Sequence, residues 1–414
     1  MAVVEPNVVA LELEKVVPDV QTLFDYDDKF FTHIDKKNVE KISYRQMRVP
    51  LALRPGGNFG YFDPNGGDLG RGSGPEWDKA VVQSVFLKEG IEYTKLTQWA
   101  TDDARKSVKN AVRELVAKAL DEFKKQIDSQ TMQSGTGQVG TISSVTTSGG
   151  VDTVVLTNQF GAKLVRYNQV VQVFDSTMAT NRGSATITLW DVANNTIQLT
   201  PAIASIAATD VLITEGITSP LSMPALYGVP YQHSNASTGT WLGFSRASTP
   251  EIRANRVNAG GSPFSVPLPR LAINQIGNRV GIDNNFKPEA WLHPCQKQAY
   301  EDVGQSVSFI QKQPKEEGLN MYFDKMSMAG AGTKESYSWD KTRIDFVSPK
   351  VWGRGETLPI GFYKTDGRNI FEIRGASGGV ATAEIFYMVA GFQIFVNNPA
   401  ACAYIDNLAI PAGY

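Results

Sequence analysis

The feature that most constrains this chain is one long periodic segment, residues 101–133. Its apolar positions recur every three or four residues, at Ala104, Val108, Val112, Leu115, Ala119, Phe123 and Ile127. That spacing places a single apolar stripe along one face of a helix. At 1.5 Å per residue the helix would be roughly 50 Å long. We therefore expect a long helix that a sheet covers along one side. A coiled coil is the alternative, but the repeat stops after about four heptads.

Composition narrows the class of protein. The 414 residues allow about two or three domains. Lys plus Arg is 40 against 42 for Asp plus Glu, so the chain lacks the basic excess of most sequence-specific nucleic-acid binders. The only cysteines, Cys295 and Cys402, argue against a disulfide framework or a four-thiolate metal site. The first 20 residues show no basic leader and no apolar run reaches the length of a membrane span, so we expect neither a signal peptide nor a membrane anchor.

The N-terminal hundred residues combine an acidic segment with an extended one. Residues 1–40 interrupt their apolar clusters with proline, and we interpret them as an arm that lies over another part of the structure. Residues 41–96 contain two flanks rich in Val, Ile, Tyr and Phe around a glycine-rich tip at 55–77, which is typical of a long two-stranded ribbon. A lone two-stranded hairpin is only marginally stable in water. We therefore expect something outside the ribbon to support it.

The middle and C-terminal parts alternate between β-rich and mixed patterns. Residues 141–217 consist of short strand-like stretches separated by GG, NRG and NN turn signals, which predict a small antiparallel barrel or sandwich inserted into the chain. Helices are expected to open at Pro267 or Pro269 and at Pro294. The apolar β-rich run at 380–396 is the surface that the long helix needs to pack against.

Several sequence motifs match the patterns of cofactor or catalytic sites, but the structure expected around them does not fit such sites. GTGQVG at 135–140 fits a dinucleotide-binding pattern, but it follows a helix and precedes strands, the reverse of a phosphate site. GASGG around Ser377 precedes a strand-like run and indicates a hairpin turn rather than a nucleophile elbow. His293 and Cys295 flank a proline and lack evident further ligands, so we favour a structural role over an enzyme site. We expect no catalytic, cofactor or metal site.

The order of these parts resembles the major capsid proteins of tailed bacteriophages, which share the Hong Kong 97-like fold. The likeness is carried by RQMRVPLALRPGGNFGYF and WDKAVVQSVFLKEG for the extended E-loop, by the long helix with DSQTMQSGTGQVGTI for the spine of the peripheral (P) domain, and by EAWLHPCQKQAYEDVG and IDFVSPKVWGRGETLPIGFY for the axial (A) domain. The resemblance implies an α+β chain divided into an N-terminal arm (1–40), the E-loop ribbon (41–96), the P-domain spine helix (97–140), an inserted β-barrel or sandwich domain (141–217), a P/A connecting region (218–264), the A domain (265–361) and P-domain C-terminal strands (362–414).

The resemblance also implies a function. The chain would be the major capsid protein of a tailed phage, not an enzyme, and would self-assemble through hexameric and pentameric capsomers into an icosahedral shell. The shell would enclose DNA without sequence-specific binding. Scaffolding, portal and decoration proteins are the expected partners, and the virion, assembled in the host cytoplasm, is the expected location. An encapsulin-type cellular compartment is the alternative of the same fold, against which the extra β domain and the chain length count. A tail-tube or other phage structural protein is a further alternative, but such a chain would usually consist more uniformly of β structure.

In the resembled family the E-loop of one subunit lies across the P domain of the next, so we expect the ribbon to supply the subunit interface. The candidate interface residues are Arg48, Arg54, Phe59, Tyr61, Phe62, Arg71 and Trp77. Truncating a large aromatic at the centre of an interface commonly costs more than about 2 kcal/mol. Acidic and basic residues balance along the ribbon, so we expect shape and aromatic contacts to matter more than bulk electrostatics.

Overall fold

The fold is taken from a computed structural model. The structure describes residues 29–34, 40–43, 45–61, 70–94, 108–222, 225–281, 288–307, 328–365, 368–374 and 380–414. The first 28 residues of the expected arm, the expected helix start at Thr101, and Phe62 therefore lie outside the described residues. No helix in the described ranges is long and apolar enough to cross a membrane.

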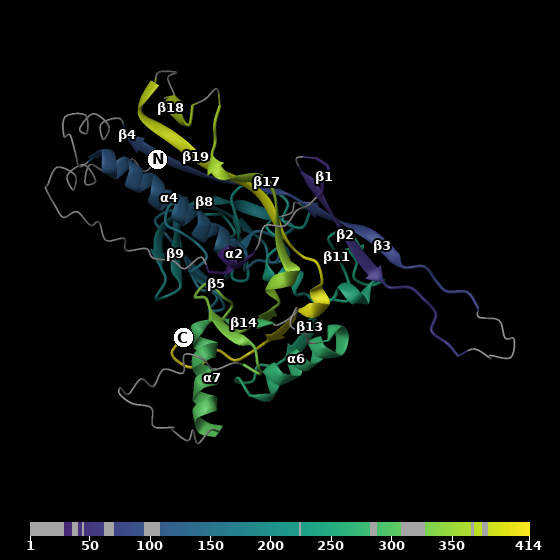
Figure 1. Ribbon diagram of the computed structural model, residues 1–414. Helices are drawn as coiled ribbons and strands as arrows, with labels where there is room; N and C mark the ends of the chain where they lie inside the picture. The colour runs from purple at the N-terminus through teal and green to yellow at the C-terminus, as the bar shows by residue number, and fades with distance from the viewer. Residues whose placement is uncertain are drawn as a thin grey trace, which may run out of the picture.

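A long helix lies on a four-stranded sheet, as the sequence predicts (Figure 1). The elements are α4 (Val108–Gln130), β4 (Val85–Thr94), β17 (Trp352–Phe362), β18 (Ile370–Arg374) and β19 (Val380–Val396). Strand β19 is the centre of this sheet, because β4 pairs with one edge and β17 and β18 pair with successive parts of the other. Phe123 and Ile127 of α4 share one buried core with Met388 and Phe392 of β19.

A separate closed barrel follows the helix. Its strands, in the order β10-β5-β6-β9-β8-β7, are all antiparallel. They are β5 (Gln138–Ser148), β6 (Val151–Leu156), β7 (Val170–Phe174), β8 (Asn181–Asp191), β9 (Thr196–Thr200) and β10 (Val211–Thr214). The barrel has its own core, in which Val154, Ile187 and Leu199 are fully buried. The β structure expected at 141–217 is thus a barrel, and its status as an inserted domain stays a proposal.

A second, five-stranded sheet carries two helices. Its order is β13 (Asn255–Asn258), β20 (Ala403–Asp406), β16 (Ile344–Val347), β14 (Glu289–Leu292) and β15 (Gly332–Glu335). The helices are α6 (Pro267–Val280) and α7 (Pro294–Val307). Both begin at the prolines that mark their first turns in the sequence, where the missing N–H of proline costs no helical hydrogen bond. Ala272 and Ile276 of α6 are buried with Phe346 in the core of this sheet.

The two sheets are interleaved along the chain, unlike the expected division into consecutive blocks. Strand β20 lies within the range expected for P-domain strands but joins the sheet of α6 and α7. Strand β17 lies within the range expected for the A domain but pairs with β19. Local sequence patterns identify strands and say little about distant pairing partners. The remaining short elements are α5 (Val229–Gln232), β11 (Thr240–Trp241), β12 (Phe244–Ser245), η1 (Pro250–Ile252), η2 (Pro349–Val351) and η3 (Pro399–Ala401).

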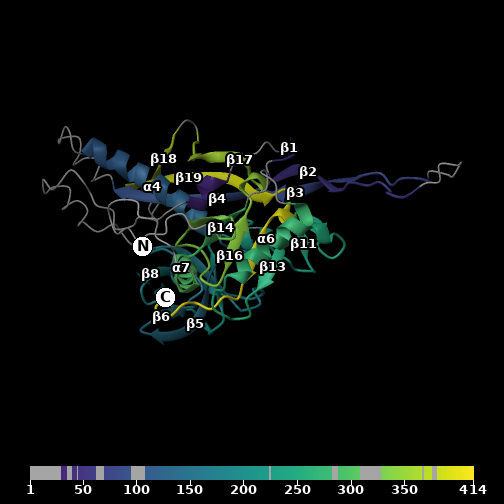
Figure 2. The ribbon, with the colours of Figure 1, turned by 60° about the horizontal axis from the view of Figure 1, so that its bottom comes forward.

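The ribbon projects far from the body (Figure 2). It consists of β2 (Gln46–Arg54) and β3 (Glu76–Gln83), with the short β1 (Glu40–Lys41) beside β2. The returning flank, expected to run on to residue 96, breaks at Ser84, and β4 then joins the central sheet. At the base, Met47 and Val82 pack against Trp241 and Phe395. The ribbon is therefore supported at its base by its own chain.

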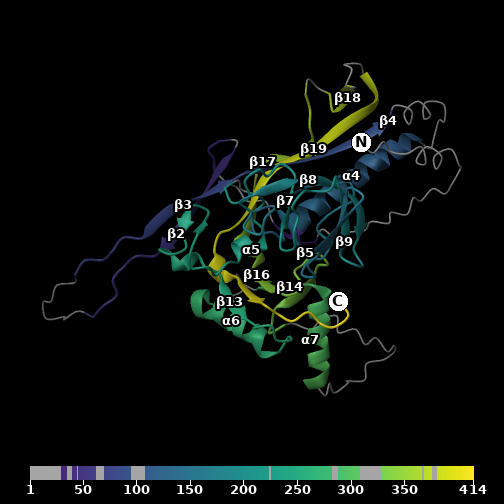
Figure 3. The same ribbon diagram turned by 180° about the vertical axis from the view of Figure 1, so that it is seen from behind.

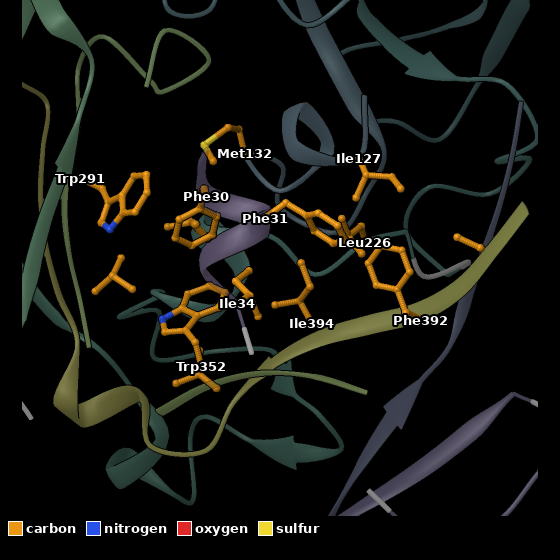
Figure 4. Packing of buried hydrophobic residues seen from close by; sticks show 14 of the residues in the cluster. Phe30, Phe31, Ile34, Ile127, Met132, Leu226, Trp291, Trp352, Phe392 and Ile394 are labelled. Carbon is orange, nitrogen blue, oxygen red and sulfur yellow. The ribbon is translucent and has the colours of Figure 1, made fainter. Parts of the chain in front are cut away.

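The end of the N-terminal arm is inserted into the main core. Helix α2 (Lys29–His33) buries Phe30 and Phe31, which are 1% and 3% exposed. The ring of Phe30 meets three tryptophans edge-on, at centroid distances of 5.0 Å to Trp291, 5.3 Å to Trp339 and 5.4 Å to Trp352. Figure 4 shows Phe30 between Trp291 and Trp352. This segment therefore packs against distant parts of the chain, and the assignment of residues 1–40 as an arm stays a prediction.

Candidate assembly surface

The tip of the ribbon presents aromatic side chains almost entirely to solvent. Phe59 is 93% and Tyr61 99% exposed. Their rings lie 6.1 Å apart, edge to face. Figure 3 shows the ribbon from the other side, reaching outward on its own. Isolated exposed apolar residues are ordinary on protein surfaces, but a projecting pair of exposed rings fits a surface that binds a partner.

The loop that carries these rings is ordered by backbone contacts across the ribbon. The Gly57 N–H donates to the Ser73 carbonyl at 2.7 Å, and the Ser73 hydroxyl donates to the Gly57 carbonyl at 3.2 Å. Gly56 has a φ of +69°, and a Cβ there would lie 2.5 Å from the Gly74 carbonyl. Only glycine permits this approach of the two sides. The glycine-rich composition therefore lets the two sides of the ribbon close tightly beneath the exposed rings.

The other expected interface residues are distributed along the ribbon. Arg71 is exposed near the tip, and Arg48 is exposed on β2 near the base. Trp77 is 69% exposed on β3. Arg54 forms ion pairs within its own chain, at 3.1 Å to Glu76 and 3.1 Å to Glu251. Arg54 thus holds the ribbon to η1. The role of all these residues in an interface stays a prediction.

A second apolar surface, which the sequence analysis missed, lies on the central sheet opposite α4. We call it the outer sheet face, and it comprises Phe86, Leu358, Tyr363, Phe371 and Tyr387. Phe86 is 49% and Tyr363 47% exposed. A Cβ on Gly391 would lie 2.7 Å from the Phe86 ring, and one on Gly90 would lie 2.9 Å from the Tyr387 ring. The glycines therefore make room for rings to lie against the sheet. Strand glycines directly opposite aromatic residues were the signal that could have revealed this face.

His293 and Cys295 are hydrogen-bonded to each other at the start of α7. The Cys295 N–H donates to His293 Nδ1 at 3.1 Å, so the imidazole accepts a hydrogen bond from the first turn of the helix. Burial, with nearby lysines, lowers the pKa of His293 to about 4, and burial raises the pKa of the Cys295 thiol to about 11. A neutral imidazole beside a protonated thiol is the reverse of an activated nucleophile. No group of three or more His, Cys, Asp or Glu side chains within the described residues is placed to hold a metal.

A buried ionic cluster links the end of α5 to β16. His233 Nδ1 lies 3.0 Å from Asp345 Oδ1, and Arg343 donates to both oxygens of that carboxylate at 2.7–3.0 Å. Burial opposes ionisation of Asp345, but the charge of Arg343 and the hydrogen bond from His233 outweigh it and lower its pKa. Burial likewise opposes charge on His233, yet its Cys402 and Asp345 neighbours raise its pKa to about 9. Asp345 is 1% exposed and His233 is fully buried, so this cluster has a structural role.

Comparison by sequence finds no match: no family model fits the chain and no curated protein matches it. Solved structures do match. The structure aligns with a chain of the capsid asymmetric unit of cyanophage A-1(L) over 97% of this chain and 99% of that one, with a TM-score of 0.59 and 11% identity. The chain has the Hong Kong 97-like fold. The sequence-based expectation of that fold is confirmed.

Further solved structures align with lower scores. The capsid of a native GTA particle covers 98% of this chain with a TM-score of 0.49 and 10% identity, and 100% of its own chain is covered. The holo-SrpI encapsulin complex from Synechococcus elongatus covers 100% of this chain, and 99% of its own, with a TM-score of 0.47 and 8% identity. At these scores neither structure adds to the argument on function.

Proposed function

We propose that this chain is the major capsid protein of a tailed bacteriophage, which self-assembles into the icosahedral shell around the DNA genome. The observation that carries the proposal is the ribbon tip, where Phe59 and Tyr61 form a contact surface that a single copy leaves uncovered. The shared fold with a cyanophage capsid chain over nearly the whole length supports it. Assembly would proceed through hexameric and pentameric capsomers in the host cytoplasm, and the mature location is the virion.

The assembly contact that we propose joins the ribbon tip of one copy to the outer sheet face of the next. Both surfaces carry exposed rings in the single chain, Phe59 and Tyr61 on the tip and Phe86 and Tyr363 on the sheet. Aromatic side chains bury about 150–250 Å² each when covered, so docking the two tip rings would remove a substantial apolar area from water. In a closed ring each subunit both gives and receives this contact. The contacts of Arg54 and Trp241, which hold the ribbon to the body of the subunit, would set the direction in which the tip reaches.

The net charge of −2 fits a protein that encloses DNA without recognising a particular base sequence. Scaffolding, portal and decoration proteins would be the further partners. An encapsulin-type compartment would use the same fold and the same ribbon contact. The contents of the particle distinguish the two, because a phage shell contains DNA and an encapsulin contains protein cargo.

Replacing Phe59 and Tyr61 together with alanine should impair assembly while leaving the subunit folded. Each ring lost from the centre of an interface should weaken the contact by about 2 kcal/mol, which is about thirtyfold in association constant. Sedimentation velocity should show free subunits or small oligomers in place of large particles, and the circular dichroism spectrum should be unchanged.

The matched control is Tyr167→Ala, which removes a 57% exposed ring from the barrel. This variant should assemble like the unaltered chain. Normal shells from the Phe59/Tyr61 double variant would mean that the tip does not form the subunit contact.

A further inference from the structure

A half-buried carboxyl group on β4 lies beside charged groups of the long helix and of the barrel. Glu89 is on β4, where it pairs with the fully buried Met388 of β19. Its neighbours two residues away on either side, Leu87 and Ile91, pack against the main core. Because alternate residues of a strand share a face, the Glu89 side chain lies on the α4 side of the sheet. Its Oε2 atom is buried, and no described residue offers it a hydrogen bond.

The charged groups around Glu89 do not neutralise it. Glu122 of α4 adds a second negative charge, and Arg166, from the segment between β6 and β7, adds one positive charge. Arg166 Nε donates to Glu122 at 2.9 Å, and its Nη1 donates to the carbonyls of Lys163 and Val165 at 2.7 and 3.0 Å. The arginine thus holds Glu122 to the barrel. The guanidinium of Arg166, which already donates to Glu122 and to two backbone carbonyls, is therefore shared between the carboxyl groups of Glu89 and Glu122.

The remaining elements packed here provide no compensating charge among the described residues. Met388 of β19 is apolar, and strand alternation places Lys88 and Glu92 of β4 on the outer sheet face. An ionised carboxylate whose buried oxygen has no donor is costly, whereas a protonated carboxyl group in the same place is neutral.

We propose that protonation of Glu89 controls how tightly β4 packs against α4 and the barrel. We call this contact the joint, which is closed when the elements are packed together and open when they separate. With its proton, the neutral side chain packs against α4 beside the pair of Glu122 and Arg166. Without the proton, its charge repels Glu122 and loosens β4 from the helix. Since β4 continues from β3 of the ribbon through Ser84, loosening at Glu89 reaches the base of the ribbon. This device controls how firmly the ribbon is held and goes beyond the proposed function of the chain.

The direction of the effect follows from the pKa of Glu89. Burial, followed by repulsion from Glu122, raises this pKa from 4.5 to about 7, and Arg166 offsets part of the rise. In an opened joint the carboxyl group is solvated and has its ordinary pKa. The closed joint therefore binds more protons between the two values, and it loses stability relative to the open form as pH rises from about 4.5 to 7. Above about pH 7 both forms are ionised, and no further change is expected.

Hydrogen exchange measured by mass spectrometry on the purified, assembled protein tests this proposal. Peptides from β4 and α4 should lose protection by about a hundredfold between about pH 5 and about pH 7.5, after correction for the intrinsic exchange rate. Glu89→Gln, which is isosteric and cannot ionise, should abolish this pH response. Glu92→Gln, on the same strand but on the outer face, should retain it.

A pH response in Glu89→Gln equal to that of the unaltered chain would overturn the proposal. Constant protection of β4 and α4 in the unaltered chain across this pH range would also overturn it, and that measurement does not depend on any variant folding.

Discussion

Replacing Phe30 with alanine should lower the free energy of unfolding by about 3–5 kcal/mol, the range for removing a large ring from a packed core. The loss is large because the Phe30 ring is 1% exposed and fills the space between three tryptophans. A five-residue helix has no stability of its own, so α2 depends on this packing and on the hydrogen bond from the Phe31 N–H to Asp128 at 2.7 Å. Tryptophan fluorescence during urea unfolding measures the change.

The comparison variant for Phe30→Ala, measured like it on unassembled subunits, is Tyr61→Ala, which deletes a ring that is 99% exposed in the single chain. Its unfolding midpoint should match that of the unaltered chain, because no buried contact is lost. If Phe30→Ala unfolded at the same urea concentration as Tyr61→Ala, α2 would not be part of the folded core.

Asp345→Asn should cost about 3–5 kcal/mol, because it leaves Arg343 and a protonated His233 buried without a counter-charge. Asparagine has nearly the same shape, so lost charge rather than lost volume causes the effect. In the unaltered chain the charge of His233 contributes stability fully below about pH 6.5, and this contribution is lost as pH rises through about 9. Asp345→Asn should weaken this pH dependence, because it removes one of the two neighbours that raise the pKa of His233, and urea unfolding at several pH values measures the change.

The matched control for the buried pair is Asp406→Asn in the same sheet. Asp406 accepts from Arg256 at 2.9 and 3.0 Å, but the arginine side chain is 39% exposed. Solvent-exposed ion pairs contribute about 0–1 kcal/mol, so this variant should be nearly neutral. Equal effects of the two substitutions would contradict the structural role given to the buried cluster.

Much of the architecture could be predicted because it depends on local patterns. The apolar stripe of α4, the turn-separated strands of the barrel and the prolines that open α6 and α7 are all readable within short windows of sequence. The choice of sheet for β17 and β20 could not be predicted, because strand pairing depends on residues far apart in the chain. The same holds for the ionic cluster, whose His233 and Asp345 are 112 residues apart.

The candidate surface was predictable in part. The glycine-rich tip and its aromatic residues predicted a subunit interface, and the structure leaves Phe59 and Tyr61 exposed there in the single chain. The ion pair of Arg54 with Glu251 at 3.1 Å could not be predicted from the local sequence, and a role for Arg54 in a subunit interface stays a prediction. The insertion of Phe30 among tryptophans was equally hidden, since an isolated pair of phenylalanines in an acidic segment has no periodicity to interpret.

Electron microscopy of the purified chain, concentrated at neutral pH, tests the central claim most directly. The account predicts closed icosahedral shells, or the ring-shaped capsomers from which they are built, with the ribbon of each subunit lying on its neighbour. A homogeneous 45.2 kDa monomer at every concentration would contradict it.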